Sequence, residues 1–158
     1  MKILVQQQKA LNMLDIAAKF VSKNSTLPIL QNIYLKASID SLLIRATDME
    51  KYVEIEIPCE VQIEGAITIN AKTFLDILKT IESENIELSV DQKTNIMTIK
   101  TPKDTFDING IAASEYVALP EVPQENSFVL DTLAFSKGID HVEYAVTEKS
   151  FSPVLTGV

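Results

Sequence analysis

Apolar and polar residues follow two different periods along this chain, and these periods predict its elements. Apolar residues that share one side at about 100° per residue predict helices over residues 7–23 and 71–81, the second capped by Asn70. Two-residue alternation and short apolar runs predict strands. The predicted strands cover residues 3–6, 29–36, 42–47, 53–57, 65–69, 86–90, 96–100 and 105–109. Two helices lying against a largely antiparallel sheet are typical of the α+β class.

The opening of this pattern returns near the end of the chain. Residues 27–33 (LPILQNI) correspond to residues 152–158 (SPVLTGV), and Pro153 follows Pro28 by 125 residues. Solenoid repeats run to roughly 20–50 residues, so this spacing predicts a duplicated domain. We expect a complete copy over residues 1–120, a linker over 121–127, and a second copy over 128–158 that breaks off in mid-domain. In the second copy, residues 128–130 are the expected strand and Asp131 is the expected helix cap.

Composition narrows the class of protein. The chain has 158 residues, of which 46% are hydrophobic, and its apolar runs are shorter than the ~20 residues that span a membrane. A single cysteine, Cys59, excludes an intramolecular disulfide and fits a reducing cytoplasm. The net charge of −8 argues against nucleic acid as a partner, but all of it comes from residues 81–158. Residues 1–80 are neutral and could present a local basic face.

The residues that most often perform catalysis form no recognisable set. His141 is the only histidine and lies on the polar side of the predicted third helix, and Cys59 is interpreted as an inert thiol at a strand end. A zinc site needs three or four close ligands, which these two residues cannot supply. The four glycines form no loop that could hold a phosphate. We therefore expect no metal and no cofactor.

Acidic residues are the best remaining catalytic candidates. Asp48 and Glu50 stand close to Glu54 and Glu56, and paired carboxylates can perform acid–base or Mg²⁺ chemistry. Residues two apart on a strand also share its solvent face, which explains Glu54 and Glu56 without chemistry. A hydrolase or transferase that uses Asp48 and Glu50 is thus one hypothesis for this chain.

The polar faces of the first two helices carry more lysine than aspartate. Their charged residues are Lys9, Asp15, Lys19 and Lys23 on the first helix, and Lys72, Asp76 and Lys79 on the second. The other polar residues on these faces are Gln, Asn, Ser and Thr, which can bond phosphate without reading bases. The same faces could also be simply solvated, in a non-catalytic α+β interaction module that does not contact DNA. The residues alone leave both interpretations open.

Four short motifs resemble one known family. Residues 26–33 (TLPILQNI), followed by 47–50 (TDME), closely resemble the bacterial sliding clamp, the beta subunit of DNA polymerase III. Residues 70–74 (NAKTF) head the second helix in the same way, and residues 152–158 look like the opening of the family's middle domain. In this order and at this spacing the motifs are specific. The resemblance covers the whole chain, as the family's first domain and the start of its second.

The resemblance implies a DNA-clamp fold and a function without catalysis. In the family, two three-domain subunits close head-to-tail into a ring, with sheets outside and helices lining the hole. Such a ring encircles duplex DNA without sequence specificity, is opened by a clamp loader, and tethers the replicative polymerase. Because this chain stops within the second copy, we expect its self-association into a ring to be impaired.

The resemblance also implies three groups of site residues. The DNA-facing residues would be Lys19, Lys23, Asn24, Lys72, Lys79, Lys149 and Ser150. Phe106 and Ile108 would belong to the subunit interface, and Ser152 and Leu155 to part of the groove that binds partner peptides. Asn24 and Ser152 depart from the family, in which arginine is frequent at both positions.

Overall fold

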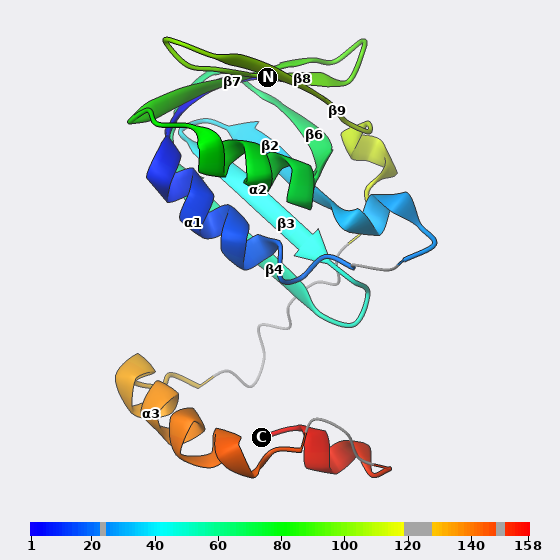
Figure 1. Ribbon diagram of the computed structural model, residues 1–158, viewed down its shortest axis with the longest axis vertical. Helices are drawn as coiled ribbons and strands as arrows, with labels where there is room; N and C mark the ends of the chain where they lie inside the picture. The colour runs from blue at the N-terminus through cyan, green and yellow to red at the C-terminus, as the bar shows by residue number, and fades with distance from the viewer. Residues whose placement is uncertain (23–24, 119–127, 148–150) are drawn as a thin grey trace. The chain divides into compact units, whose positions relative to one another are not determined.

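The computed structural model describes residues 1–22, 25–118, 128–147 and 151–158 (Figure 1). The chain divides into two compact units, Met1–Leu119 and Pro120–Val158. No helix among the described residues is long and apolar enough to cross a membrane.

The larger unit contains two antiparallel sheets instead of the one that we expected. The five-stranded sheet has the order β5-β1-β7-β8-β9, with β5 Glu60–Ile63, β1 Lys2–Gln6, β7 Asn85–Asp91, β8 Ile96–Lys100 and β9 Thr105–Asn109. The four-stranded sheet has the order β4-β3-β2-β6, with β4 Tyr52–Pro58, β3 Ser41–Thr47, β2 Asn32–Ser38 and β6 Gly65–Asn70. The predicted α+β class with antiparallel pairing is confirmed.

Two helices of the larger unit, α1 (Gln7–Ala17) and α2 (Ala71–Thr80), lie side by side (Figure 1). They run antiparallel, with the start of α1 beside the end of α2. At that point the side chain of Gln7 donates a hydrogen bond to the carbonyl of Leu78, at 2.8 Å. Their apolar sides close the core against the sheets: Ala10, Leu14 and Ala17 of α1 and Phe74 and Leu78 of α2 are buried. The opposite sides of both helices are left to solvent.

The larger unit also repeats its own order of elements. The series β1-α1-β2-β3-β4 is followed by β6-α2-β7-β8-β9, with β5 between them. The first strand of each series pairs with a strand of the other series. β1 pairs with β7, and β6 pairs with β2. Each series ends in an edge strand, β4 or β9. The two series share an order of elements and not a sequence motif. The sequence therefore revealed the 125-residue repeat but not this shorter one.

The first helix is shorter than predicted. It ends at Ala17, and the following residues form a tight turn in which Lys19 and Phe20 donate backbone hydrogen bonds to Ile16 and Ala17, at 3.1 and 3.0 Å. The turn brings Phe20 and Val21 against the core, where both are partly buried. Packing of these two apolar residues therefore ends the helix before the predicted residue 23, which lies outside the described residues.

The strand predicted to start at residue 29 begins later. Pro28–Gln31 forms a short 3-10 helix, η1, and the strand starts at Asn32. Proline suits the first turn of a helix because its φ is already helical and its missing N–H would have no partner there. Leu27, which precedes the proline, is extended as predicted.

The smaller unit contains one α-helix and no strand among its described residues. Its helix α3 spans Thr132–Val142, and Asp131 caps it as predicted by accepting a hydrogen bond from the Ala134 N–H at 2.8 Å. The strand predicted over residues 128–130 is wrong, because a strand needs a partner and the described part of this unit has none. The smaller unit also contains the 3-10 helices η3 Glu143–Ala145 and η4 Pro153–Thr156, whereas η2 Ala113–Glu115 belongs to the larger unit. The predicted linker 121–127 lies outside the described residues.

Candidate nucleic-acid interface

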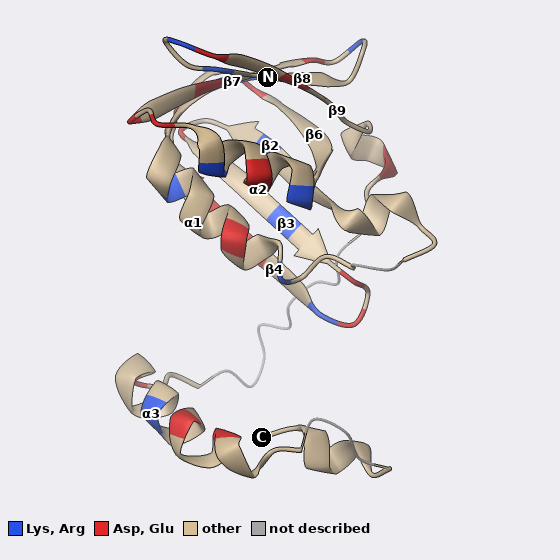
Figure 2. Ribbon diagram, in the orientation of Figure 1, with Lys and Arg blue, Asp and Glu red and all other residues tan. Residues whose placement is uncertain are grey.

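The exposed side of α2 carries two lysines. Asn70 fixes the start of the helix by accepting a hydrogen bond from the Thr73 N–H at 3.0 Å, as predicted. Since Phe74 and its apolar neighbours face the core, Lys72 and Lys79 are turned outward and are exposed. Neither lysine forms an ion pair with a described residue. Figure 2 shows these two basic positions on α2 with an acidic one between them.

The exposed side of α1 adds further lysines. Lys19 follows the helix and pairs with Asp15 at 3.5 Å, with both side chains at least half exposed. An exposed pair of this kind contributes only ~0–1 kcal/mol, so Lys19 can exchange Asp15 for another anion at little cost. Lys9, to which the resemblance gives no role, is also exposed on α1. Because the helices are antiparallel, Lys9 lies toward the Lys79 end of the pair and Lys19 toward the Lys72 end.

A groove of about 450 Å³ separates the end of α1 from the start of α2. It is lined by Ala18, Val21, Ser22, Gln31, Asn70, Ala71, Lys72 and Leu75. Gln31 comes from η1, so the LPILQN motif lies beside the groove at the start of α2. The motif's next residue, Asn32, is buried and donates a hydrogen bond to the Thr68 hydroxyl at 3.2 Å. Both observations give this motif a structural role next to the lysine-bearing helices.

Four of the seven residues that the resemblance turns toward DNA lie outside the described residues: Lys23, Asn24, Lys149 and Ser150. The other three are all exposed: Lys72 and Lys79 lie on α2, and Lys19 lies in the turn that follows α1. The helix pair and this turn therefore present these three lysines to solvent.

The two residues expected at a subunit interface belong to an edge strand. Phe106 and Ile108 lie on β9, the last strand of the five-stranded sheet. Ile108 is buried and Phe106 is partly buried against the same core. Their side chains thus face inward, and the part of β9 that remains open is its backbone edge.

The two residues expected in a peptide groove lie in and next to η4. Leu155 is 56% exposed, and its carbonyl accepts a hydrogen bond from the Thr147 N–H at 3.2 Å. Ser152 precedes the 3-10 helix, and its carbonyl accepts the Leu155 N–H at 3.1 Å. The apolar side chain of Leu155 is therefore available for contact.

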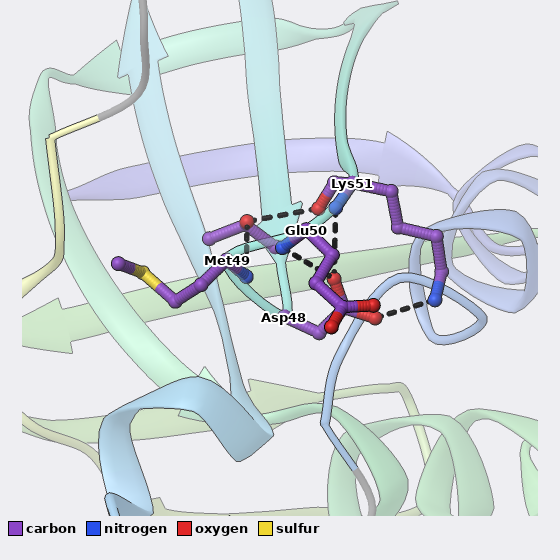
Figure 3. Close-up of polar contacts among 5 residues, drawn as sticks. Asp48, Met49, Glu50 and Lys51 are labelled. Atoms are coloured by element: carbon purple, nitrogen blue, oxygen red, sulfur yellow. Dashed lines mark hydrogen bonds and ion pairs between the residues drawn. The ribbon is translucent and has the colours of Figure 1, made fainter. Parts of the chain in front are cut away.

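Asp48, the strongest catalytic candidate of the sequence, holds a tight turn between β3 and β4 (Figure 3). Its carboxylate accepts the backbone N–H groups of Glu50 and Lys51, at 3.1 and 2.9 Å, and also bonds the Lys51 ammonium. The hydrogen bond from the Lys51 side chain, helped by these N–H groups, lowers the pKa of Asp48 to about 2. The carboxylate is thus committed to the turn as a charged acceptor.

The neighbouring residues complete the same turn. The Thr47 hydroxyl accepts the Met49 N–H and donates to the Lys51 carbonyl, both at 2.9 Å (Figure 3). Met49 adopts a positive φ of 79°, which the surrounding bonds stabilise. Glu50 is exposed. The TDME motif is therefore explained by the fold, without a catalytic pair.

The other candidate groups lie apart from one another. Burial, followed by the charge of Asp40, raises the pKa of the Cys59 thiol and makes it less reactive. His141 is exposed on α3. Among the described residues, no three His, Cys, Asp or Glu side chains are grouped so that they could hold a metal ion.

Comparison with known proteins decides the family. Residues 1–120 match the family described as the DNA polymerase III beta subunit, N-terminal domain. The chain belongs to this family. Curated relatives of this chain include the beta sliding clamp of Bacillus subtilis, which is 30% identical over all of this chain and 44% of the relative. The beta sliding clamp of Halalkalibacterium halodurans is 32% identical over 89% of this chain and 39% of the relative. The chain thus spans less than half the length of these relatives.

Solved structures of sliding clamps have the same fold as this chain. The crystal structure of the DNA polymerase sliding clamp from Bacillus subtilis superposes with a TM-score of 0.91 at 27% identity, covering all of this chain and 43% of the clamp. A Helicobacter pylori beta clamp bound to a DNA ligase peptide gives a TM-score of 0.87 at 24% identity, over 96% of this chain and 42% of that one. The DNA-clamp fold that the motifs predicted is confirmed.

Proposed function

We propose that this chain is part of a DNA sliding clamp, a non-catalytic processivity factor of the cytoplasm. The complete protein would encircle duplex DNA without reading its sequence and tether the replicative polymerase. Two observations support the proposal. The chain belongs to the beta subunit family, and its antiparallel helix pair with the turn after α1 presents exposed Lys19, Lys72 and Lys79. The second observation is the decisive one, because exposed lysines supply a positively charged surface that can bind DNA phosphates.

The sparse lysines suit a protein that moves along DNA. Lysine ammonium groups are point charges that attract phosphate at any position along a duplex, and none of them reads a base. With few phosphate contacts the affinity is low, and it falls with salt by an amount proportional to the number of contacts. A ring around the duplex would then hold the protein in place, while weak contacts leave it free to slide.

The remaining parts of the site follow from the same proposal. Residues 1–120 would be the first clamp domain, 121–127 a linker and 128–158 the start of the second domain. Lys23, Asn24, Lys149 and Ser150 would extend the DNA-facing layer. Phe106 and Ile108 would lie in the subunit interface of a ring, and a clamp loader would open that ring. Ser152 and Leu155 would belong to a groove for partner peptides, a use that the ligase-peptide complex of the Helicobacter pylori clamp supports.

Charge reversal tests the DNA contact directly. Fluorescence anisotropy of labelled duplex DNA over a salt series should show weak binding, and the slope against salt should fall by roughly 0.9 for each phosphate that a variant no longer neutralises. We expect Lys19→Glu, Lys72→Glu and Lys79→Glu each to reduce the affinity and this slope. The matched control is Lys93→Glu, which makes the same charge change in the exposed turn between β7 and β8. Equal reductions in all four variants, or a preference for one DNA sequence, would contradict the proposal.

A further inference from the structure

We propose that Asp15 and Asp76 limit the DNA affinity of the lysine-bearing helix pair, and that they do so in two different ways. Asp15 competes with DNA phosphate for Lys19, whereas Asp76 repels phosphate between Lys72 and Lys79. This inference rests on the proposed function, and it adds the residues that keep the contact with DNA weak.

The stability of the helices does not explain these two acids. Each helix contains a single acidic residue, and neither lies at the start of its helix, where a carboxylate is favourable. Asp15 lies in the last turn of α1, where the helix dipole disfavours negative charge. Asp76 lies in the middle of α2, where aspartate is a poor helix former. The property that both residues do change is the charge that the helix pair presents to solvent.

Asp15 holds Lys19 in a pair that phosphate can break. Oδ2 of Asp15 and Nζ of Lys19 are 3.5 Å apart, and the two side chains are 50% and 69% exposed. Lys19 forms no other ion pair with a described residue. A phosphate that binds Lys19 must displace the Asp15 carboxylate, so the loss of the old contact reduces the gain from the new one. Asp15 therefore weakens the contact with DNA while it leaves Lys19 accessible.

Asp76 acts on two lysines and pairs with neither. It is exposed, and it follows Lys72 by four residues and precedes Lys79 by three, so the three side chains share the outward face of α2 (Figure 2). No described residue lies close enough to Asp76 to form an ion pair with it. A phosphate that approaches either lysine thus meets a free carboxylate nearby. The two anions repel each other, most strongly at low salt.

Together the two acids cancel half of the positive charge of the helix pair and the turn after α1. The exposed lysines there are Lys9, Lys19, Lys72 and Lys79. Affinity for duplex DNA and its dependence on salt both increase with the number of phosphates that a protein neutralises. A ring that encloses the duplex stays on it without tight contacts, and every contact must break when the ring moves. The two acids therefore favour movement along DNA over tight binding.

Asparagine variants of this chain test the inference. Asp15→Asn and Asp76→Asn keep the shape of the side chain and remove its charge. In fluorescence anisotropy with labelled duplex DNA at low salt, we expect each to raise the affinity by about 2- to 5-fold. Asp15→Asn should also increase the slope against salt by up to roughly 0.9, because Lys19 is then free to neutralise a phosphate. The matched control is Asp40→Asn, which removes the same charge from the exposed turn between β2 and β3 and should bind as wild type does.

A second background separates the two mechanisms. In Lys19→Gln no ammonium remains for Asp15 to hold. We therefore expect Asp15→Asn to change the affinity of this variant no more than Asp40→Asn does, and Asp76→Asn to keep its full effect. An undiminished effect of Asp15→Asn in this background would overturn the competition between Asp15 and phosphate.

The outcomes separate this inference from the proposed function. If the wild-type chain binds DNA through its lysines and neither helix variant binds more tightly, the inference is overturned and the proposed function stands. Equal gains in Asp40→Asn would also overturn the inference, because net charge alone would then set the affinity. Binding that can be measured only in the two helix variants would support it. If neither the wild type nor any asparagine variant binds DNA, both the inference and the proposed function are contradicted.

Discussion

At the scale of single residues, Tyr116 shows how the fold holds the segment that follows β9. Its hydroxyl lies 3.4 Å from the carbonyls of both Asn32 and Arg45, so it joins the segment to β2 and β3. Its ring packs against Tyr34, with 5.6 Å between ring centroids, and the Arg45 guanidinium lies 5.8 Å from the Tyr34 centroid. Burial raises the pKa of Tyr116 to about 12, because the ionised phenolate loses hydration there.

The raised pKa predicts how stability depends on pH. The folded state favours the neutral hydroxyl, so this contribution is complete below the ordinary pKa of 10 and is lost as the pH rises through about 12. We expect Tyr116→Phe to lower the free energy of unfolding by about 1 kcal/mol at neutral pH, through loss of the hydrogen bond. The variant should also reduce the fall in stability between pH 10 and 12. Urea unfolding at a series of pH values measures both effects.

A second tyrosine provides the control for this experiment. Tyr52 lies on edge strand β4 and is 39% exposed. Tyr52→Phe should keep the wild-type dependence of stability on pH. If the two variants show the same dependence, the burial of Tyr116 does not govern it.

At the scale of elements, one buried side chain holds the two lysine-bearing helices together. Gln7 is 7% exposed and bonds the Leu78 carbonyl through its side chain, and its backbone N–H bonds the Glu84 carbonyl at 2.9 Å. The carbonyls near the end of a helix have no partner within the helix, so this bond satisfies one of them in α2. Gln7 thereby fixes where α1 starts relative to the end of α2.

Removal of this side chain should cost stability. We expect Gln7→Ala to lower the free energy of unfolding by about 1–3 kcal/mol, because the Leu78 carbonyl then loses its side-chain donor in a buried place. Gln8→Ala is the matched control, since Gln8 is exposed and its side chain donates a hydrogen bond to exposed Asn12 on the same helix. It should change stability by less than about 0.5 kcal/mol. Denaturant unfolding of both variants gives the comparison, and equal decreases would refute this role of Gln7.

The elements also show what the sequence could predict. The hairpin strands over residues 96–100 and 105–109 were predicted with their observed bounds, because local alternation and a short turn define them. Strand β5 was missed: it is four residues long and pairs only with β1, which is distant in sequence. The exposure of Lys72 and Lys79 followed from helical periodicity. The open edge of β9 did not, since a strand's place in a sheet depends on long-range pairing.

At the scale of the whole molecule, the two units differ in how they bury apolar residues. The larger unit contains the entire hydrophobic core of the described chain, with Phe74, Ile33 and Leu35 among its fully buried residues. In the smaller unit no described residue is buried, and large apolar side chains such as Phe135 and Tyr144 are more than half exposed. Tertiary packing is what stabilises most helices in proteins, and the described residues of its own unit give α3 little of it.

This difference predicts that backbone amides of the two units are protected from hydrogen exchange to different degrees. An isolated helix of about 12 residues is marginal in water, and α3 has 11 residues, so we expect its amides to exchange nearly as fast as in an unfolded peptide. The amides of α2, with 10 residues, are the matched comparison, and the buried Phe74 and Leu78 should slow their exchange by several orders of magnitude. Hydrogen exchange followed by mass spectrometry resolves the two helices. Equal protection of α2 and α3 would show that α3 is packed, and a partner surface for Phe135 and Tyr144 would then have to exist in solution.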